Sequence, residues 1–302
     1  MLHKLKFAFK NRTTGSAAKA LSENMKSICK GNFSDLYGFI FYFMGGTVSS
    51  AYKNRSLLKK LRSQYFDIKK NYYNFNGVRL PAVLSEDIFA RSSFLGEMED
   101  TIFSSVGIPV ESFNEGPYEY GQVKIPTQGC IFDIGANLGT FSAVASARII
   151  KGKGQIFAFE PIPKVFKYLQ STANLHDNIV PVQKAVSNCS GNFDIYFNGN
   201  SNSSIMFDKG GKKLTVATIT IDEFIEKNSL QSVDFIKADI EGAERYMLMG
   251  AKRTLKDFAP MLAICTYHLP DDKEVLEGLI KEANPNYVIE HKWKKLYAYV
   301  PK

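Results

Sequence analysis

The sequence contains few cysteines, and none of them has the spacing of a metal or redox site. Cys29, Cys130, Cys189 and Cys265 are far apart and include no Cys-x-x-Cys pair. This pattern argues against a zinc ribbon and against a framework of disulfides. Four scattered thiols fit best in a reducing compartment such as the cytoplasm.

Long apolar runs are also missing. Lysines at positions 4, 6 and 10 interrupt the first ten residues, so we expect no secretory signal. The most apolar run, Leu36–Val48, includes Gly38, Gly45 and Gly46 and is shorter than the ~20 residues that span a bilayer. We therefore expect a cytoplasmic protein that could contact the inner membrane face only peripherally.

Positive charge is concentrated in the first quarter of the chain. Residues 1–80 hold 15 Lys and Arg against 3 Asp and Glu, whereas residues 81–302 hold 23 against 27. A solvated helical face explains such a block, and attachment to an anionic membrane surface is the main alternative. The same region is a candidate contact for substrate or for a second copy of the chain, whereas we do not expect nucleic acid as a partner.

The pattern along the chain predicts two regions. Residues 1–110 are expected to form a basic helical N-terminal region, and residues 111–302 the main domain. Within the first region we expect helix over much of 33–70 and again over 85–105, with a turn at 71–77. The second helix would carry an acidic solvated face that can pair with the basic segment; its residues are Glu86, Asp87, Glu97, Glu99 and Asp100.

From Gly129 onward, short apolar runs alternate with helical segments, as βαβ units require. The fold class expected is α/β, with a doubly wound, mostly parallel sheet of seven strands and a helical N-terminal extension. A closing pair of strands is typical of methyltransferases rather than of dinucleotide dehydrogenases. The predicted strands are Cys130–Ile134, Gln155–Phe159, Ile179–Lys184, Val233–Ala238, Met261–Thr266, Tyr287–Glu290 and Leu296–Val300, with an extended excursion at Phe193–Phe197 and Leu214–Ile219 around the loop Asn198–Lys213.

A glycine-containing turn follows the first of these strands. Gly135 and Gly139 allow a tight turn and a close approach of ligand to backbone, and a helix begins directly afterwards. Asn137 stands where a dinucleotide-binding turn has its second glycine, so it obstructs a pyrophosphate but can bind an amino-acid-like ligand. Glu160, at the end of the second strand, can accept both hydroxyls of a ribose. An ordinary capped turn with a surface glutamate is the simpler alternative.

These segments resemble the FkbM-like family of class I methyltransferases. The resemblance rests on Phe132–Ser142, Phe159–Pro161, Thr220–Glu223 and Asp234–Glu244, and it covers about residues 115–300. It implies transfer of a methyl group from S-adenosyl-L-methionine, usually to a hydroxyl oxygen, on sugars of bacterial surface glycans or on secondary metabolites. The basic block in residues 1–80, rather than the resemblance, suggests a lipid-linked glycan precursor as the acceptor. The first hundred residues show no family signature.

The cofactor-binding residues are expected at the strand ends. Lys184, Ala185 and Val186 follow the third strand and would edge the adenine. Tyr118, Glu119 and Tyr120 precede the first strand and would either cover the pocket or pack in the core. The full predicted set is Asp133, Gly135, Asn137, Gly139, Thr140, Phe141, Glu160, Pro161, Lys184, Ala185, Val186 and Asp239.

Three residues are candidates for catalysis. Asp239 or His268 would take the proton of the acceptor hydroxyl, and Glu241 would position the acceptor or the cofactor's amino group. The alternative is that both carboxylates merely stabilise a helix N-terminus. A divalent ion held by Asp239, Glu241 and His268 is conceivable but not favoured, since no Asp-Asn pair follows the fifth strand.

Two other functional classes stay open at this point. A nicotinamide-dependent oxidoreductase would use the same turn and ribose-binding acid. A non-catalytic nucleotide-binding protein would use the basic segment to hold a partner. The intact turn and acid favour a working cofactor site over a decayed one.

Overall fold

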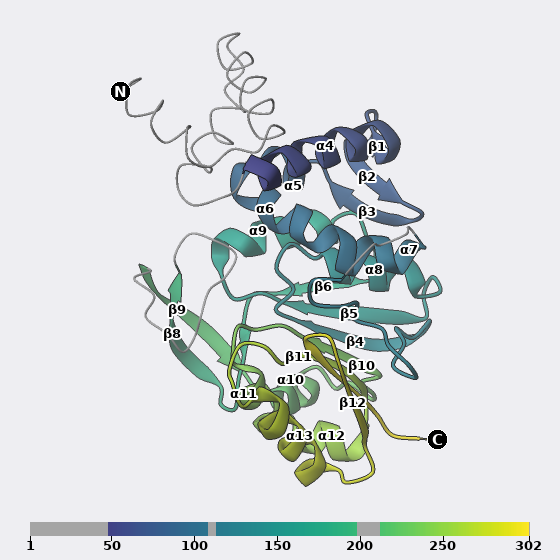
Figure 1. Cartoon of the computed structure of the whole chain (residues 1–302). Coiled ribbons are helices and arrows are strands. Elements are labelled where there is room, and N and C mark those ends of the chain that lie inside the picture. Colours follow the sequence, from purple (N-terminus) through teal and green to yellow (C-terminus); the bar gives the residue numbers. More distant parts are fainter. Residues whose placement is uncertain (1–47, 108–112, 198–211, 302) are drawn as a thin grey trace. The chain divides into compact units, whose positions relative to one another are not determined.

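A computed structural model of the chain describes residues 48–107, 113–197 and 212–301 (Figure 1). Two compact units divide between Tyr65 and Phe66. In the first unit the described part is helix α4 (Val48–Tyr65), so most of the basic N-terminal segment lies outside the described residues. Among the described helices, none combines the length and apolar character needed to cross a membrane.

The second unit contains a seven-stranded sheet in the order β12-β13-β11-β10-β4-β5-β6. Only β13 runs antiparallel to its neighbours, and the other pairings are parallel. The predicted doubly wound, mostly parallel sheet with a closing strand pair is therefore confirmed. The strands are β4 (Gly129–Ile134), β5 (Gly154–Phe159), β6 (Ile179–Val182), β10 (Phe235–Ala238), β11 (Met261–Cys265), β12 (Val288–Lys292) and β13 (Lys295–Tyr299).

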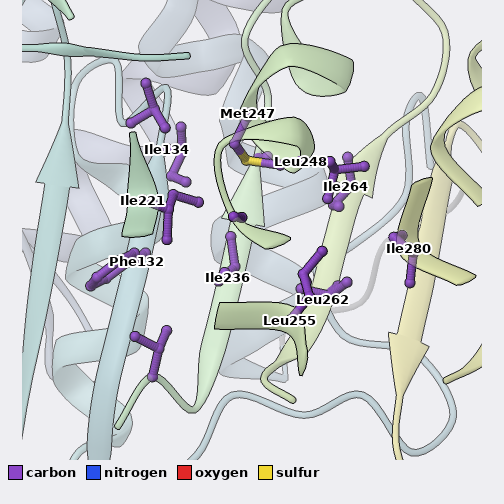
Figure 2. Close-up of a cluster of buried hydrophobic side chains, with 14 of the residues drawn as sticks. Phe132, Ile134, Ile221, Ile236, Met247, Leu248, Leu255, Leu262, Ile264 and Ile280 are labelled. Carbon is purple, nitrogen blue, oxygen red and sulfur yellow. The ribbon is translucent and has the colours of Figure 1, made fainter. Parts of the chain in front are cut away.

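The sheet is buried on both faces because helices cover each of them. Along β4, Phe132 and Ile134 point into a core with Ile236, Leu262 and Ile264 (Figure 2). Four helices complete that core, namely α10 (Ile221–Lys227), α11 (Glu244–Met249), α12 (Lys252–Asp257) and α13 (Asp272–Ala283). The alternate β4 residues face the other side, where α8 (Thr140–Arg148) and α9 (Pro163–Ala173) pack. Successive side chains of a strand point to opposite faces of the sheet, and both faces are apolar, so the sheet is packed between two layers of helices.

The extended excursion after β6 forms a second small sheet. Strand β8 (Gly191–Phe197) pairs antiparallel with β9 (Lys212–Ile219), and β9 pairs parallel with the short β7 (Ala185–Val186). The hairpin was predicted as extended structure on both arms. Most of the intervening loop lies outside the described residues.

A small antiparallel sheet corrects the prediction for the segment before residue 82. Strands β1 (Phe66–Asp67), β2 (Tyr72–Phe75) and β3 (Val78–Pro81) stand where we expected the end of a helix and a turn. Asn76 and Gly77, with φ of 52° and 99°, form the turn between β2 and β3. Two successive residues at positive φ give a hairpin turn that matches strand twist, which is why Asn-Gly occurs here.

Residues 83–106 are helical except at Asp87, which agrees with the helix predicted over 85–105, but they belong to the second unit. They comprise α5 (Val83–Glu86), α6 (Ile88–Glu97), the π-helix η1 (Met98–Phe103) and α7 (Ser104–Val106). Strand β3 and η1 both pack on α8. The compact unit therefore begins at Phe66, earlier than the boundary that we placed at residue 111.

Candidate functional site

A cavity of about 350 Å³ opens at the carboxyl ends of β4, β5 and β10. Strands β4 and β10 are neighbours in the sheet, but the next strand after β4 is added on one side of this pair and the next strand after β10 on the other. Ligands bind at such a switch point in open α/β sheets. Ten of the predicted cofactor residues line this cavity: Gly135, Asn137, Thr140, Phe141, Glu160, Pro161, Lys184, Ala185, Val186 and Asp239.

The turn after β4 is held tightly against the end of β10. Gly135 has a φ of 75°, and a Cβ atom there would lie 1.9 Å from the backbone oxygen of Asp239. Asn137 also has a positive φ, of 50°. Its Nδ2 donates a hydrogen bond to Oε1 of Glu97 at 2.8 Å. The Asn137 amide is thus part of the cavity wall and is already engaged by a protein carboxylate.

Glu160 directly follows β5 and accepts hydrogen bonds from two backbone groups. Its Oε1 accepts from the Ile162 N–H at 2.9 Å and its Oε2 from the Asn137 N–H at 3.2 Å. The side chain is only 6% exposed, and this burial raises the pKa of Glu160 to about 7 despite the two hydrogen bonds. Each carboxylate oxygen can accept a second hydrogen bond, so capacity for a ligand's hydroxyl groups remains.

Two of the predicted cofactor residues lie behind the wall. Asp133 is fully buried, pairs with Nζ of Lys237 at 3.0 Å and accepts a hydrogen bond from the Ser142 hydroxyl at 2.6 Å. Gly139 precedes α8, and a Cβ atom there would crowd Leu169 at 2.9 Å. Both residues therefore shape the turn, but neither lines the cavity.

The three candidate catalytic residues are brought together. Nε2 of His268 lies 3.5 Å from Oδ1 of Asp239 and 3.8 Å from Oε2 of Glu241. Its Nδ1 lies 3.1 Å from Oε1 of Glu244, a contact with the distance of an ion pair although it lacks hydrogen-bond geometry. The ring is thus surrounded by carboxylates on both nitrogens.

Glu244 organises this cluster from the first turn of α11. Its two oxygens accept hydrogen bonds from the backbone N–H groups of Ile240 and Gly242, at 2.8 and 3.0 Å. These bonds fold the segment from Asp239 to Gly242 around one buried carboxylate. Glu244 was noted only as part of the family-like segment, and its positioning role was not predicted.

The charges of the cluster are strongly coupled. Burial favours a neutral ring, but the contact with Glu244 and the charges of Asp239 and Glu241 outweigh it and raise the pKa of His268 to about 9. Burial also opposes ionisation of Asp239, yet Lys237, His268, Lys295 and the Tyr118 hydroxyl hold its pKa below the ordinary value. At neutral pH His268 is therefore cationic and Asp239 anionic.

Tyr118 covers the cavity beside Asp239. Its hydroxyl donates a hydrogen bond to Oδ2 of Asp239 at 3.1 Å, and its ring packs edge-on against Phe141. Nζ of Lys295 and Nζ of Lys237 lie 4.5 and 5.4 Å from the ring centre. The other two residues of this segment do not line the cavity: Glu119 pairs with Arg148, and Tyr120 packs against Trp293 and Tyr297.

The acidic face predicted for residues 85–105 is not simply a solvated surface. Glu97 and Asp100 both line the cavity. Asp100 is buried and accepts hydrogen bonds from the backbone N–H groups of Asn114 and Glu115. Both carboxyl groups therefore belong to the site. The segment that carries them packs against the rest of the unit because it also contains buried apolar residues, such as Phe94 on α6 and Ile102 on η1.

Among the described residues, two groups of side chains have the composition of a cation site. One consists of Glu115, Asp239 and Cys265, and the other is centred on His268. Ligand atoms of Asp239, Glu244 and His268 lie within 4.8 Å of one another. Both Glu244 oxygens already accept backbone hydrogen bonds, and Oε1 also lies 3.1 Å from Nδ1 of His268, so the cluster is stabilised by its own charges. For this reason we do not assign these residues as metal ligands.

A sequence model of the FkbM methyltransferase domain matches residues 133–293, more than half of the chain. The chain belongs to the FkbM methyltransferase family. The matched range includes the turn after β4, Glu160, Asp239 and His268. Glu97, Asp100 and Tyr118 precede it.

Two curated proteins are similar to this FkbM-family chain. The hexuronic acid methyltransferase AglP of Haloferax volcanii is 28% identical over 157 residues, which cover 51% of this chain and 62% of that protein. The 2-O-methyltransferase NoeI of Sinorhizobium fredii is 25% identical over 143 residues, covering 41% and 58%. The match thus spans less than two thirds of either relative. Among solved structures, an FkbM methyltransferase from Methylobacillus flagellatus aligns with a TM-score of 0.43 at 24% identity, over 57% of this chain and 44% of that one.

Proposed function

We propose that this protein is an S-adenosylmethionine-dependent O-methyltransferase that acts on a sugar hydroxyl. Membership of the FkbM methyltransferase family carries the proposal. The curated relative named as a hexuronic acid methyltransferase supports a sugar as the acceptor, and the one named as a 2-O-methyltransferase supports transfer to an oxygen atom. A surface glycan or its lipid-linked precursor is the acceptor class that we favour from the sequence.

The residues on the cavity wall fit this cofactor. Glu160 offers acceptor oxygens at the strand end where a ribose is bound in such folds. Ala185 and Val186 offer apolar surface for a base. When bound, S-adenosylmethionine supplies an electrophilic methyl group on a sulfonium. The carboxyl groups of Glu97, Glu160 and Asp239 suit a ligand that bears this positive charge.

We propose Asp239 as the group that takes the acceptor's proton. A hydroxyl that gains a methyl group must lose its proton, and Asp239 is ionised and lines the cavity. His268 does not line it and is cationic at neutral pH. We assign Asp239 as the proton acceptor, His268 with Glu244 as the charged pair that positions it, and Glu241 as a contact for the acceptor.

The pH profile of methyl transfer separates the two candidate bases. Saturating S-adenosylmethionine confines the titration of Glu97 and Glu160, whose pKa values lie near 8 and 7, to cofactor binding. With Asp239 as the base, kcat under these conditions should be nearly constant between pH 6 and 8, and Asp239→Asn should lower it by roughly 10²-fold or more. If His268 were the base, kcat would rise with pH toward about 9, where its pKa lies. A profile that rises throughout this range would reverse the assignment.

Ligand binding tests the proposed cofactor itself. Calorimetry of the whole chain should show saturable binding of S-adenosylhomocysteine, weakened by Glu160→Ala, and no binding of NADH. NADH binding without S-adenosylhomocysteine binding would support the oxidoreductase alternative. If neither ligand bound, a non-catalytic role would become the better explanation. Mass spectrometry of surface glycans from source cells with and without the gene would then identify the acceptor through the missing methyl group.

A further inference from the structure

Glu97 brings a carboxyl group to the cavity from outside the family-matched residues. It is the last residue of α6, whereas the match begins at residue 133. Its Oε1 holds the Asn137 amide in the turn after β4, and the side chain lines the cavity. The family match therefore does not include this carboxyl group.

The wall that Glu97 joins has an excess of acidic groups. Lys237 is engaged by Asp133 and by the Gly135 carbonyl, and Lys295 by the carbonyls of Glu115 and Gly116. A ligand in the cavity therefore meets a wall that favours positive charge. The acidic lining residues are Glu97, Asp100, Glu115, Glu160, Asp239 and Glu241, against the basic residues Lys184, Lys237 and Lys295.

We propose that Glu97 is a cofactor-binding residue that recognises the positive sulfonium of S-adenosylmethionine and so discriminates against S-adenosylhomocysteine, whose thioether sulfur carries no charge. The inference rests on the proposed function. The two ligands differ by one methyl group and by the permanent sulfonium charge. A carboxylate in a cavity interacts with such a charge more strongly than one in open water, because the surrounding protein screens less. Discrimination of this kind would favour release of the product.

The pKa of Glu97 lies close to neutral pH, so a nearby charge can change its protonation state. Burial raises its pKa to about 8, while Lys237 and the Asn137 amide lower it and Asp133 and Asp239 raise it. A fixed cation nearby lowers a carboxyl pKa, so arrival of the sulfonium should release the proton that Glu97 holds at neutral pH. The other titratable groups facing the cavity are Asp100, Glu115, Tyr118, Glu160, Lys184, Glu241, Tyr267 and Lys295.

Calorimetry of the whole chain at pH 7, in two buffers with different ionisation enthalpies, tests the proposal. Binding of S-adenosylmethionine should release more protons than binding of S-adenosylhomocysteine. Glu97→Gln should remove this difference and weaken S-adenosylmethionine binding roughly tenfold, the size expected for a hydrogen bond or contact to a charged group. Its effect on S-adenosylhomocysteine should be less than about twofold. The matched control is Glu274→Gln on the exposed surface of α13, which should behave like the wild type.

A second variant separates charge recognition from support of the turn. Asn137→Gly removes the amide that Glu97 holds and is compatible with the positive φ at this position. It should retain the preference for S-adenosylmethionine. Equal weakening of both ligands by Glu97→Gln, or loss of the preference in Asn137→Gly, would show that Glu97 acts only by holding the turn.

The wild-type measurement keeps the proposal testable even if the Glu97 variant does not fold. If the wild type bound both ligands with equal affinity and equal proton release, the inference would be overturned while the proposed function stood. If it bound neither ligand, the proposed function itself would fail.

Discussion

At the scale of single residues, three of the described side chains whose ordinary pKa lies below 7 have a raised pKa in the folded protein. Burial raises the pKa of Glu97 to about 8 and that of Glu160 to about 7. The carboxylates around His268 overcome its burial and raise its pKa to about 9. The site therefore favours the protonated forms of these two carboxyl groups and of the imidazole.

This arrangement predicts that the cofactor-free protein becomes less stable as pH rises. A group whose folded pKa is raised contributes stability below its unfolded pKa and loses it as pH rises through the folded pKa. For both glutamates the loss of stability begins above about pH 4.5, and it is complete near pH 7 for Glu160 and near pH 8 for Glu97. For His268 the loss extends from pH 6.5 to about 9. Thermal unfolding between pH 5.5 and 8.5 should show a falling Tm.

Glu97→Gln should make this fall shallower, because the amide stays neutral across the range. The His268 contribution should persist in the variant above pH 7. Glu274→Gln, on the exposed surface, should keep the wild-type slope. An unchanged slope in Glu97→Gln would show that this carboxyl does not titrate abnormally.

At the scale of elements, the sequence predicts the sheet well because each strand carries its own signal. Runs such as Phe235–Ala238 are buried throughout and are flanked by helical segments. The hairpin of β2 and β3 was missed although Asn76-Gly77 is a strong hairpin signal, because the strands beside it are only four residues long. The run from Asn71 to Gly77 therefore resembled one continuous turn.

Some residues of the site could be predicted from local sequence patterns, and others could not. The turn after β4, Glu160 and Asp239 follow strands directly, so their common location could be predicted from the order of the elements. Glu97 lies 40 residues before its partner Asn137 and on an element outside the sheet. Only the packing of α6 and η1 turns its carboxyl inward, and no local pattern encodes that packing.

The segment that carries Tyr118 provides a prediction at this scale. Nζ of Lys295, on β13, donates hydrogen bonds to the carbonyls of Glu115 and Gly116 at 3.1 and 2.7 Å. The lysine is 1% exposed, so Lys295→Met would leave buried acceptors without a donor. The free energy of unfolding should fall by about 1–3 kcal/mol.

Chemical denaturation measures that change. Because the same segment positions the Tyr118 hydroxyl on Asp239, the variant should also lose affinity for S-adenosylhomocysteine. Lys252→Met, which removes an exposed lysine paired with Glu282 on the surface, serves as the control and should change stability by less than about 1 kcal/mol. Equal effects of the two substitutions would contradict the anchoring role of Lys295.

At the scale of the whole molecule, the cavity and all of its lining residues lie within residues 66–302. The remaining residues 1–65 hold 12 Lys and Arg against 2 Asp and Glu. The chemistry that we propose is thus contained in one unit, and the excess of positive charge is concentrated in the other. We therefore propose a catalytic role for residues 66–302 and a role in location for residues 1–65.

Flotation with lipid vesicles tests the membrane role expected from that charge. The whole chain should float with vesicles that contain phosphatidylserine, since each basic residue near an anionic surface contributes about 1 kcal/mol. It should not float with phosphatidylcholine alone, and about 1 M salt should release it because charges are then screened within a few ångströms. A chain of residues 66–302 should bind S-adenosylhomocysteine as the whole chain does yet stay unbound to vesicles. Equal flotation of the two forms would assign membrane contact to the catalytic unit, whereas flotation of neither would leave the basic segment as a contact for substrate or for a second copy of the chain.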